Sequence, residues 1–285
     1  MKKILVSPVL KWVGGKRQLL NEIIPLISTD CSTYVEPFVG GAAVLFKLQP
    51  KKAIINDYNE ELINVYKTIR DNPEELIEKL KEHECNKDSE DYFYKIRGLD
   101  RTEEFSELTN VERAARIVYL NKTCYNGLYR VNAAGQFNSP FGKYKNPNIV
   151  NATTIRAVSK YFNDNNITIN QGDYKESLKG LRKGAFVYLD PPYMPVSNSS
   201  SFTGYTDNGF GFKQQSELRD ECIKLNKKGI RFLQSNSYCP EIIDLYDLNN
   251  DKSIFKYIEV KAKRSINSKA DGRGEIDEVL IYNVQ

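Results

Sequence analysis

Short apolar runs separated by turn residues mark both ends of the chain, and this pattern predicts strands. The runs occupy residues 34–38, 53–57, 167–169, 186–189, 230–233, 255–260 and 278–282. The fourth run, extended to Ala185, is apolar throughout and is typical of a buried parallel strand. Helical patterns at residues 42–48 and 215–226 stand between strands. The sequence therefore predicts an α/β fold with a mostly parallel sheet.

The middle of the chain has a different pattern, which indicates an insertion into the sheet. Helical spacing dominates from residue 60 to about residue 120, and residues 71–75, Asp-Asn-Pro-Glu-Glu, are a helix start signal. Residues 121–147 are rich in Gly, Asn and Pro, and an irregular connection of this length is usually functional. A serine-rich tract at residues 197–201 opens a further predicted loop that extends to Phe212.

Composition places the chain among ordinary globular proteins. Of its 285 residues, 40% are hydrophobic and 27% are charged. The apolar run near the N-terminus is interrupted by Pro8 and Lys11, which argues against a signal peptide. No segment is apolar for long enough to span a membrane. We therefore expect a cytoplasmic protein with no membrane partner.

Two side chains that often carry chemistry are not arranged for it in this sequence. The five cysteines are scattered and form no C-x-x-C pair, so neither a zinc site nor a disulfide framework is predicted. His83 is the only histidine and lies in an acidic, helical stretch, where we expect a solvated surface residue. Ser-His-Asp catalysis and histidine-metal chemistry are therefore excluded, and no metal site is predicted.

The net charge of +4 is modest, but the charges are unevenly distributed. Residues 57–112 carry 17 acidic and 8 basic residues, whereas residues 113–163 carry eight basic residues and no acidic one. This basic run predicts a surface that faces a polyanion, although a solvated basic face gives the same pattern. Its members are Arg113, Arg116, Lys122, Arg130, Lys143, Lys145, Arg156 and Lys160.

Aromatic and amide side chains are interleaved within the basic run, which favours nucleic acid as the polyanion. Amides can read base edges and cations can hold phosphates, while rings can wedge between bases. The alternative is that much of the aromatic content forms a small core. The rings are Tyr125, Tyr129, Phe137, Phe141 and Tyr144, and the amides are Asn126, Asn132 and Asn138.

The tetrapeptide at residues 190–193, Asp-Pro-Pro-Tyr, follows the buried run at residues 185–189 and forms a candidate site. Open α/β sheets bind ligands at the carboxyl ends of their strands. The two prolines fix φ and remove two N–H donors, so the corner offers carbonyl and carboxylate acceptors to an amino group. An exocyclic amine of a nucleobase could then attack an electrophilic carbon while Tyr193 stacks on the base. A surface turn is the alternative for so short a motif.

The first glycine turn is not built for phosphate. A dinucleotide site needs G-x-G-x-x-G, whereas residues 36–41 read Glu-Pro-Phe-Val-Gly-Gly, and residues 14–17 lack the spacing of a P-loop. An acidic and aromatic edge suits a cationic ligand with an adenosine body, and Asp57 at the next strand end is placed to bind a ribose diol. These features describe S-adenosylmethionine, whose sulfonium supplies a methyl electrophile.

Six motifs, in order along nearly the whole chain, resemble those of Dam-type (D12 class) DNA adenine N6-methyltransferases. They are residues 11–17, 36–41, 56–57, 172–173, 190–193 and 278–283. Residues 125–130 and 135–145 resemble the recognition segment of members that methylate adenine in GATC, most of all methylases of DpnII/MboI-type restriction systems. The resemblance implies a Rossmann-like methyltransferase fold with a seven-stranded sheet at residues 1–58 and 155–285. It also implies an inserted, mainly helical target-recognition domain at residues 59–154.

The resemblance also assigns site residues. It places Trp12, Lys16, Glu36, Phe38, Gly40, Asp57, Asp173 and Asp190 around S-adenosylmethionine. A flipped adenine would lie against the catalytic residues Asp190, Pro191, Pro192 and Tyr193. DNA would be contacted by Lys11, Tyr125, Asn126, Leu128, Arg130, Asn132, Pro140, Lys143 and Lys145.

Within the DNA-contacting set the resemblance implies different roles. Tyr125 would enter the duplex as a wedge, and Lys11 would contact the first guanine. Asn126 and Arg130 would read base edges, while Pro140 would pack on the thymine methyl. Some relatives have arginine where this chain has Lys143, and because lysine offers a point charge, a phosphate contact is expected there. A second basic loop is expected either to close near the target or to be a solvated hairpin, with Lys261, Lys263, Arg264, Lys269 and Arg273 as its charges.

Methyl transfer is expected to be direct, because no cysteine lies beside a base that could activate it for attack on cytosine carbon 5. The expected partners are double-stranded DNA and, without direct contact, a restriction endonuclease that cuts the same site. In a cell the protein would then be associated with the nucleoid through DNA. Two alternatives stay open, an N4-cytosine DNA methyltransferase and a non-catalytic DNA-binding protein that responds to S-adenosylmethionine.

Overall fold

The computed structural model describes residues 6–194, 209–263 and 275–283, and the chain divides into two compact units. The first unit consists of Met1–Gly15, Gly40–Gln49 and Asn59–Gln171. The second unit consists of Lys16–Val39, Pro50–Tyr58 and Gly172–Gln285. Two predicted features lie outside the described residues, namely the serine-rich tract at 197–201 and the part of the second basic loop formed by Arg264, Lys269 and Arg273.

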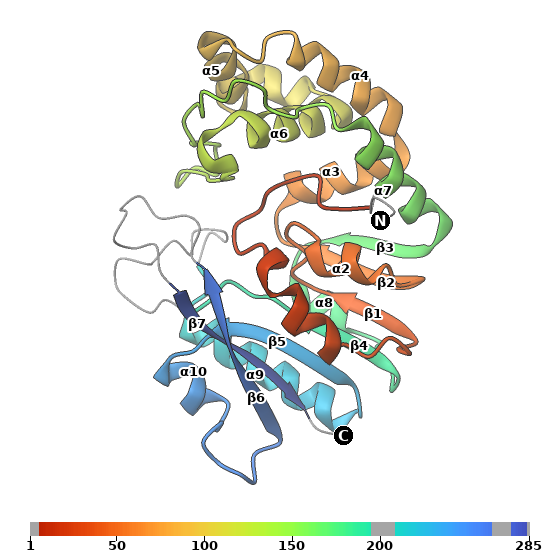
Figure 1. Cartoon of the computed structure of the whole chain (residues 1–285), viewed down its shortest axis with the longest axis vertical. Helices are drawn as coiled ribbons and strands as arrows, with labels where there is room; N and C mark the ends of the chain where they lie inside the picture. The colour runs from red at the N-terminus through yellow and green to blue at the C-terminus, as the bar shows by residue number, and fades with distance from the viewer. Residues whose placement is uncertain (1–5, 195–208, 264–274, 284–285) are drawn as a thin grey trace. The chain divides into compact units, whose positions relative to one another are not determined.

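Seven strands form one sheet, as the sequence and its resemblance predict (Figure 1). They are β1 Thr33–Glu36, β2 Lys52–Asp57, β3 Asn166–Gln171, β4 Ala185–Leu189, β5 Arg231–Ser237, β6 Phe255–Lys263 and β7 Glu275–Asn283. Their order is β3-β2-β1-β4-β5-β7-β6. β1 pairs in parallel with β2 and β4, and β4 pairs in parallel with β5. β7 is antiparallel to both β5 and β6.

Each predicted apolar run contributes to a strand, but several strand ends differ from the prediction. β1 ends at Glu36, because Pro37 has no N–H to donate to a neighbouring strand. β5 continues beyond the apolar run through residues 234–237, Gln-Ser-Asn-Ser, all of which are buried. Lys261 and Lys263 lie on β6, which is antiparallel to β7 as far as Lys263, so for these two lysines the hairpin alternative holds.

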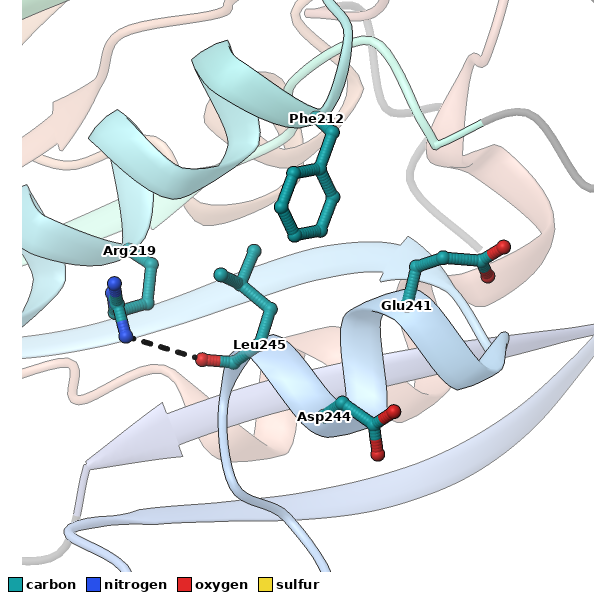
Figure 2. Close-up of a pocket in the computed structure, with 5 residues that line it drawn as sticks. All are labelled: Phe212, Arg219, Glu241, Asp244 and Leu245. Atoms are coloured by element: carbon teal, nitrogen blue, oxygen red, sulfur yellow. Dashed lines mark hydrogen bonds between the residues drawn. The ribbon is translucent and has the colours of Figure 1, made fainter.

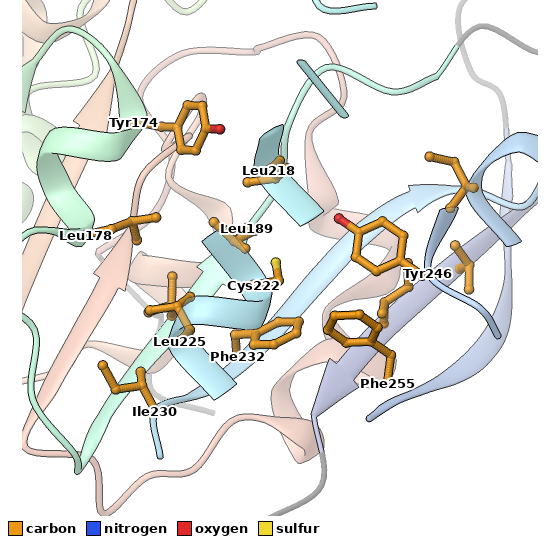
Figure 3. Close-up of a cluster of buried hydrophobic side chains, with 14 of the residues drawn as sticks. Tyr174, Leu178, Leu189, Leu218, Cys222, Leu225, Ile230, Phe232, Tyr246 and Phe255 are labelled. Carbon is orange, nitrogen blue, oxygen red and sulfur yellow. The ribbon is translucent and has the colours of Figure 1, made fainter. Parts of the chain in front are cut away.

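The core of the second unit lies between the sheet and three helices (Figure 3). These helices are α8 Tyr174–Leu178, α9 Phe212–Lys227 and α10 Pro240–Leu245. Leu218, Cys222 and Leu225 of α9 share one buried cluster with Leu189 of β4 and Phe232 of β5. Burying one such aliphatic or aromatic side chain contributes about 1.5–3 kcal/mol. The carboxyl ends of β4 and β5 are therefore held on a packed frame.

The first unit is mainly helical, and the helical region predicted from residue 60 to about residue 120 is confirmed. Asn59 caps its first long helix by accepting from the Leu62 N–H at 2.8 Å. Thr109 and Glu112 form a reciprocal capping box at another helix start. The helices are α2 Ala43–Leu48, α3 Glu60–Asp71, α4 Pro73–Glu84, α5 Glu90–Gly98, α6 Asn110–Thr123 and α7 Ala152–Asp164, with the 3₁₀ turns η3 Leu99–Arg101, η4 Glu103–Glu107 and η5 Tyr125–Gly127.

The sequence pattern did not predict α7, α8, α10 or the short helices near the N-terminus. Those short helices are η1 Lys16–Leu19, α1 Leu20–Ile23 and η2 Ile24–Leu26. A helix of three to six residues contains too few positions to show a period. α7 is longer, but Asn151 before it is followed by no acidic residue in the first turn and by no Glu or Gln three positions later, so its start signal is weak. No helix among residues 6–194, 209–263 and 275–283 combines the length and apolar character needed to cross a membrane.

His83 is not the solvated surface residue that the sequence predicts. Its ring stacks on Tyr119 of α6 with the ring centroids 4.8 Å apart, and its Nδ1 lies 2.8 Å from the hydroxyl of Tyr92 on α5. Burial lowers the pKa of His83 to about 4, so the ring is neutral at physiological pH. The pattern of α4 alone could not show this, because the covering rings come from two other helices.

Candidate functional site

Charged and aromatic side chains of the second unit gather where β4 ends. Asp190 directly follows β4, and its Oδ1 lies 2.8 Å from Lys16 Nζ. The same ammonium lies 4.6 Å from the centroid of the Tyr193 ring. The Tyr193 hydroxyl donates to Oε2 of Glu278, on β7, at 2.6 Å. The structure thus brings the predicted residues Lys16, Asp190 and Tyr193 together and adds Glu278 to them.

Burial raises the pKa of Asp190 to about 6. The Lys16 ammonium lowers this pKa, while the carboxylates of Glu278 and Asp57 raise it. Lys16 and Asp190 are only 6% and 19% exposed, so the pair is weakly screened by solvent. Burial also raises the pKa of Tyr193 well above its usual value, which keeps its hydroxyl a neutral donor. Three carboxylates and one ammonium therefore give this corner an excess of negative charge.

Buried amide and hydroxyl side chains hold the backbone of residues 192–194. Gln215 on α9 donates from Nε2 to the Pro192 carbonyl at 2.9 Å. Asn236 on β5 accepts from the Met194 N–H at 3.2 Å and donates to Gln215 Oε1 at 2.9 Å. The Ser237 hydroxyl donates to the Met194 carbonyl at 2.9 Å. Gln215 and Asn236 are both 0% exposed.

The sequence analysis did not select these supporting residues. Glu278 entered only as the first residue of the motif at residues 278–283, and Gln215 only as the start of a helix. A usable signal was the polar stretch at residues 234–237, which continues an apolar strand. Buried polar groups are almost always hydrogen-bonded, so a polar continuation of a buried strand indicates partners supplied by another segment.

The strand ends beside β4 carry the residues predicted to hold the cofactor. Asn56, at the end of β2, donates from Nδ2 to the carbonyls of Pro37 and Gly172, each at 3.0 Å. The Gly172 N–H donates to the Asp57 carbonyl at 3.1 Å, and Gly172 has a φ of +130° that favours glycine. Asn56 therefore fixes the backbone on which Asp57 is placed.

Aromatic rings cluster beside this backbone. The Phe38 ring stacks on Tyr174 with a centroid distance of 5.0 Å, and Phe210 approaches it edge-on at 5.9 Å. Glu36 is buried and accepts from the Tyr34 hydroxyl at 2.9 Å. Phe38 is only half-buried, so part of this aromatic cluster reaches the surface of the second unit.

The Asp173 side chain stabilises the start of α8. Its Oδ1 accepts from the Lys175 N–H at 2.8 Å and so caps α8. The side chain is exposed. A contact from Asp173 to a cofactor, as the resemblance implies, would therefore use a carboxylate whose orientation is already fixed by the helix start.

Trp12 and Gly40, which the resemblance also places around the cofactor, belong to the first unit. The Trp12 ring stacks on Tyr129 with a centroid distance of 4.7 Å. Gly40 has a φ of +45°, and a Cβ there would lie 3.1 Å from Trp12 Cδ1. The Tyr66 hydroxyl donates to the Gly40 carbonyl at 2.6 Å. A glycine at position 40 therefore permits both the positive φ and the close approach of the Trp12 indole.

The residues predicted to contact DNA lie mainly in the irregular segment that follows α6, also in the first unit. Tyr125 is 54% exposed, and its N–H donates to the Pro140 carbonyl at 2.8 Å. Asn126 has a φ of +58° within the turn Tyr125–Gly127 and is half-buried. The amide of Asn121 bonds to both backbone groups of Lys11, at 2.9 and 2.8 Å. The structure thus brings Lys11 to the segment that contains Tyr125 and Asn126.

Two other predicted DNA contacts are already engaged within the segment. Arg130 donates from Nε to Asn138 Oδ1 at 2.7 Å. Asn132 Oδ1 accepts from the N–H groups of Ala134 and Gln136, each at 3.0 Å, and so shapes a turn. Asn132 therefore acts first as a turn residue. Of the segment's rings, Tyr129 and Phe137 are buried, whereas Tyr125 and Tyr144 are exposed, so the small-core alternative holds for part of them.

The remaining predicted contacts differ in exposure. Lys143 is 73% exposed and pairs with Glu90 at 3.4 Å, an exposed ion pair of the kind worth at most about 1 kcal/mol. Lys145 and Pro140 are exposed, and Leu128 is half-buried.

At least five of the eight residues of the basic run form ion pairs with acidic side chains. Arg116 is buried and pairs with Asp100 at 2.8 Å, so the expectation that it lies on a charged surface was wrong. The uneven charge of the sequence thus partly reflects pairing between its acidic and basic halves. The other pairs are Arg113 with Glu60 and Glu61, Arg156 with Glu74, Lys160 with Asp164, and the Lys143 pair with Glu90 described above.

A separate pocket lies between α9 and α10 (Figure 2). It is lined by Phe212, Arg219, Glu241, Asp244 and Leu245. Arg219 donates to the Leu245 carbonyl at 3.4 Å, as the dashed line in Figure 2 marks. None of the predicted site residues lines this pocket.

Known proteins resemble the chain over nearly its whole length. Residues 12–266 match the family described as D12 class N6 adenine-specific DNA methyltransferase. A Type II methyltransferase of Lactococcus lactis subsp. cremoris is 44% identical over 281 residues, which cover 99% of this chain and 96% of the relative. A Type II methyltransferase of Methanocaldococcus jannaschii is 41% identical over 295 residues, covering 98% and 99%. A DNA adenine methylase of Serratia marcescens is 32% identical over 277 residues, covering 95% and 96%.

Proposed function

Because the chain belongs to the D12 class N6 adenine-specific DNA methyltransferase family, we propose that it methylates N6 of adenine in GATC with S-adenosylmethionine as donor. The family establishes an adenine-specific DNA methyltransferase, which acts on DNA and consumes a methyl donor. The identity of the donor, the target sequence and the flipping of the adenine out of the duplex are our proposals. They extend the family assignment to particular residues.

The observation that carries the proposal is the Asp190 carboxylate at the end of β4. With a pKa of about 6, it is ionised at neutral pH although it is largely buried. An ionised carboxylate can accept a hydrogen bond from the adenine amine, and this bond strengthens as the nitrogen becomes positive. Lys16 holds Asp190 in place at 2.8 Å, and Tyr193 offers a ring on which the base can stack.

A second acceptor for the amine follows from the bonding of the two prolines. The Pro192 carbonyl already accepts from Gln215, so we assign the Pro191 carbonyl to the second amine hydrogen. Two acceptors would hold the nitrogen lone pair in line with the methyl carbon. The nitrogen–carbon bond forms as the sulfur–carbon bond breaks, and the amine then loses one proton. Asp190, which accepts from that N–H, is placed to take it.

The corner suits a cationic methyl donor. Asp190, Glu278 and Asp57 supply an excess of negative charge, which would stabilise a sulfonium. The half-buried Phe38, stacked on Tyr174, would contact the adenosine, and Asp57 would bind the ribose diol. When bound, S-adenosylmethionine would supply an electrophilic methyl group. We assign Lys16, Glu36, Asp173 and, from the first unit, Trp12 and Gly40 to the same cofactor.

For DNA recognition we propose that residues 59–154 are the inserted target-recognition domain. The exposed Tyr125 ring, which follows the rigid α6, is suited to fill the gap that a flipped base leaves. Flipping costs a few kcal/mol, which stacking on Tyr193 would partly offset. Base contacts are assigned to Lys11, Asn126, Leu128, Arg130, Asn132 and Pro140, and phosphate contacts to Lys143 and Lys145. Two of the relatives named above are Type II methyltransferases, so we also propose a restriction endonuclease that shares the target site.

The test is methylation of plasmid DNA by the purified protein with S-adenosylmethionine and without added metal. We expect resistance to a GATC-specific endonuclease that adenine methylation blocks, and N6-methyladenine at GATC when the product is sequenced. Asp190→Ala should lower kcat by about 10²–10³ or more, because a preorganised partner of the transition state is lost. Methylation at unrelated sites would reject GATC, and wild-type turnover by Asp190→Ala would reject the proposed site.

A further inference from the structure

We propose that Gln215, Asn236 and Ser237 are positioning residues that fix the backbone of the catalytic corner for methyl transfer. The inference rests on the proposed role of Asp190 and the Pro191 carbonyl. It adds buried side chains to the site, and these side chains hold the substrate-contacting groups in place.

The two prolines make such support necessary. Pro191 and Pro192 have no N–H, so this corner cannot be fixed by the donor pattern of a regular strand or helix. The structure supplies side chains to the backbone groups that follow. Gln215 bonds to the Pro192 carbonyl, and Asn236 and Ser237 bond to the N–H and the carbonyl of Met194.

The three side chains act as one network. Asn236 Nδ2 donates to Gln215 Oε1 at 2.9 Å, and Asn236 Oδ1 also accepts from the Ser237 N–H at 2.9 Å. Gln215 is on α9 and the other two are on β5, so the corner is tied to both layers that pack in the core of the second unit. Fully bonded buried networks are rigid. A displacement of about 1 Å at a reacting group can cost about 10²-fold in rate.

The network would also determine which of the two proline carbonyls accepts from the substrate amine. Gln215 directs the Pro192 carbonyl toward α9, and we therefore assign the Pro191 carbonyl as the acceptor beside Asp190. Loss of the Gln215 donor would free the wrong carbonyl and let the corner rotate. The effect should fall on kcat, because none of the network's hydrogen bonds described above reaches a side chain that we assign to cofactor binding, such as Phe38 or Asp57.

Gln215→Glu tests the proposal with little change in volume. Below the raised pKa of a buried carboxyl, the new acid is protonated and can still donate to the Pro192 carbonyl. Above that pKa, a carboxylate would face the carbonyl and repel it. The kcat ratio of variant to wild type should therefore fall by about tenfold or more as the pH rises from about 6.5 to about 9. The KM for S-adenosylmethionine should stay within about threefold of the wild-type value.

Gln234→Glu is the matched control. Gln234 is also 0% exposed, but its Oε1 accepts from the Tyr246 hydroxyl at 2.7 Å, away from the corner. This variant carries the same burial penalty, so its kcat ratio should not change with pH. Ser237→Ala is a second probe that removes one donor to Met194 and no volume of consequence. It should lower kcat several-fold.

The outcomes separate this proposal from the proposed function. A constant kcat ratio for Gln215→Glu, or the same fall for Gln234→Glu, would overturn the positioning role while leaving Asp190 as the catalytic group. If Gln215→Glu does not fold, an unchanged kcat for Ser237→Ala overturns the role instead. Wild-type kcat in Asp190→Ala would overturn both proposals at once.

Discussion

Asp190 lies beside one cation and two further carboxylates, and its protonation follows from that balance. Burial and the charges of Glu278 and Asp57 raise its pKa to about 6, against the opposing effect of Lys16. The ionised carboxylate is the stronger acceptor for the adenine amine, and only this form can take the proton that the amine loses. We therefore expect kcat/KM to fall as the pH drops below about 6, with Asp190 defining the acid limb of the pH profile.

Glu278→Gln should move this acid limb to lower pH. The Glu278 carboxylate raises the pKa of Asp190, so a neutral amide at this position lowers that pKa and keeps Asp190 ionised in more acidic solution. The pH dependence of kcat/KM measures the shift. Tyr193→Phe is the control, because it removes the 2.6 Å hydrogen bond to Glu278 but leaves the charge. It should cost about fivefold in rate, equivalent to a typical hydrogen bond of about 1 kcal/mol, without moving the limb. Superimposable profiles for Glu278→Gln and wild type would contradict the argument.

At the scale of elements, apolar runs were sufficient to predict every strand, and helical spacing predicted α2, α9 and the helical region from residue 60 to about residue 120. Apart from α7, the missed elements are short helices that form because other segments pack against them. α8 and α10 are too short to show a period, and they exist because Tyr174, Leu178 and Ile242 complete the core of the second unit. The polar end of β5 is buried because α9 and the catalytic corner supply its hydrogen bonds.

The residues of the candidate site also fall into those that the sequence could identify and those that it could not. Asp190 and Tyr193 could be selected because they lie in a short motif with its own chemistry, and Lys16 because its segment, residues 11–17, resembles a motif of the family. Gln215 and Asn236 lie in no such motif, and their hydrogen bonds join segments about 20 to 40 positions apart in the chain. Hydrogen-bond partners of this kind depend on register and on helix placement, which periodicity does not determine.

Variants in the segment at residues 121–147 should distinguish sequence-specific recognition of DNA from general electrostatic attraction to it. Arg130, oriented by Asn138, is assigned to a guanine edge, so Arg130→Ala should cost about 1–3 kcal/mol of discrimination at one base pair. The exposed Lys143 and Lys145 are assigned to phosphates. Their alanine variants should weaken binding to all sequences and reduce the slope of log affinity against log salt by about one each. Binding titrations at several salt concentrations, on GATC and on singly altered sites, measure both effects. Unchanged preference in Arg130→Ala with relaxed preference in Lys143→Ala would reverse the assignment.

For the whole molecule, two groups in different units make opposite contributions to stability as the pH changes. Burial lowers the pKa of His83 to about 4, so the unfolded chain takes up the proton first, and stability is lost as the pH falls below about 6.5. Burial raises the pKa of Asp190 to about 6, so its contribution is present at low pH and is lost as the pH rises through 6. Between about pH 4 and pH 6.5 the two effects oppose each other in the wild-type protein.

His83→Phe should remove one of these contributions and expose the other. Phenylalanine retains the stacking on Tyr119 and loses the contact with the Tyr92 hydroxyl, a loss that is the same at every pH because that phenol stays neutral. For a pKa that shifts from about 6.5 to about 4, the free energy of unfolding of wild type relative to the variant should fall by about 2 kcal/mol between pH 7 and pH 5. Urea unfolding at the two pH values measures this difference, and Asp190→Asn should change it in the opposite direction. Parallel stability curves for wild type and His83→Phe would show that His83 titrates in the folded chain as it does in water, and would contradict its burial between α5 and α6.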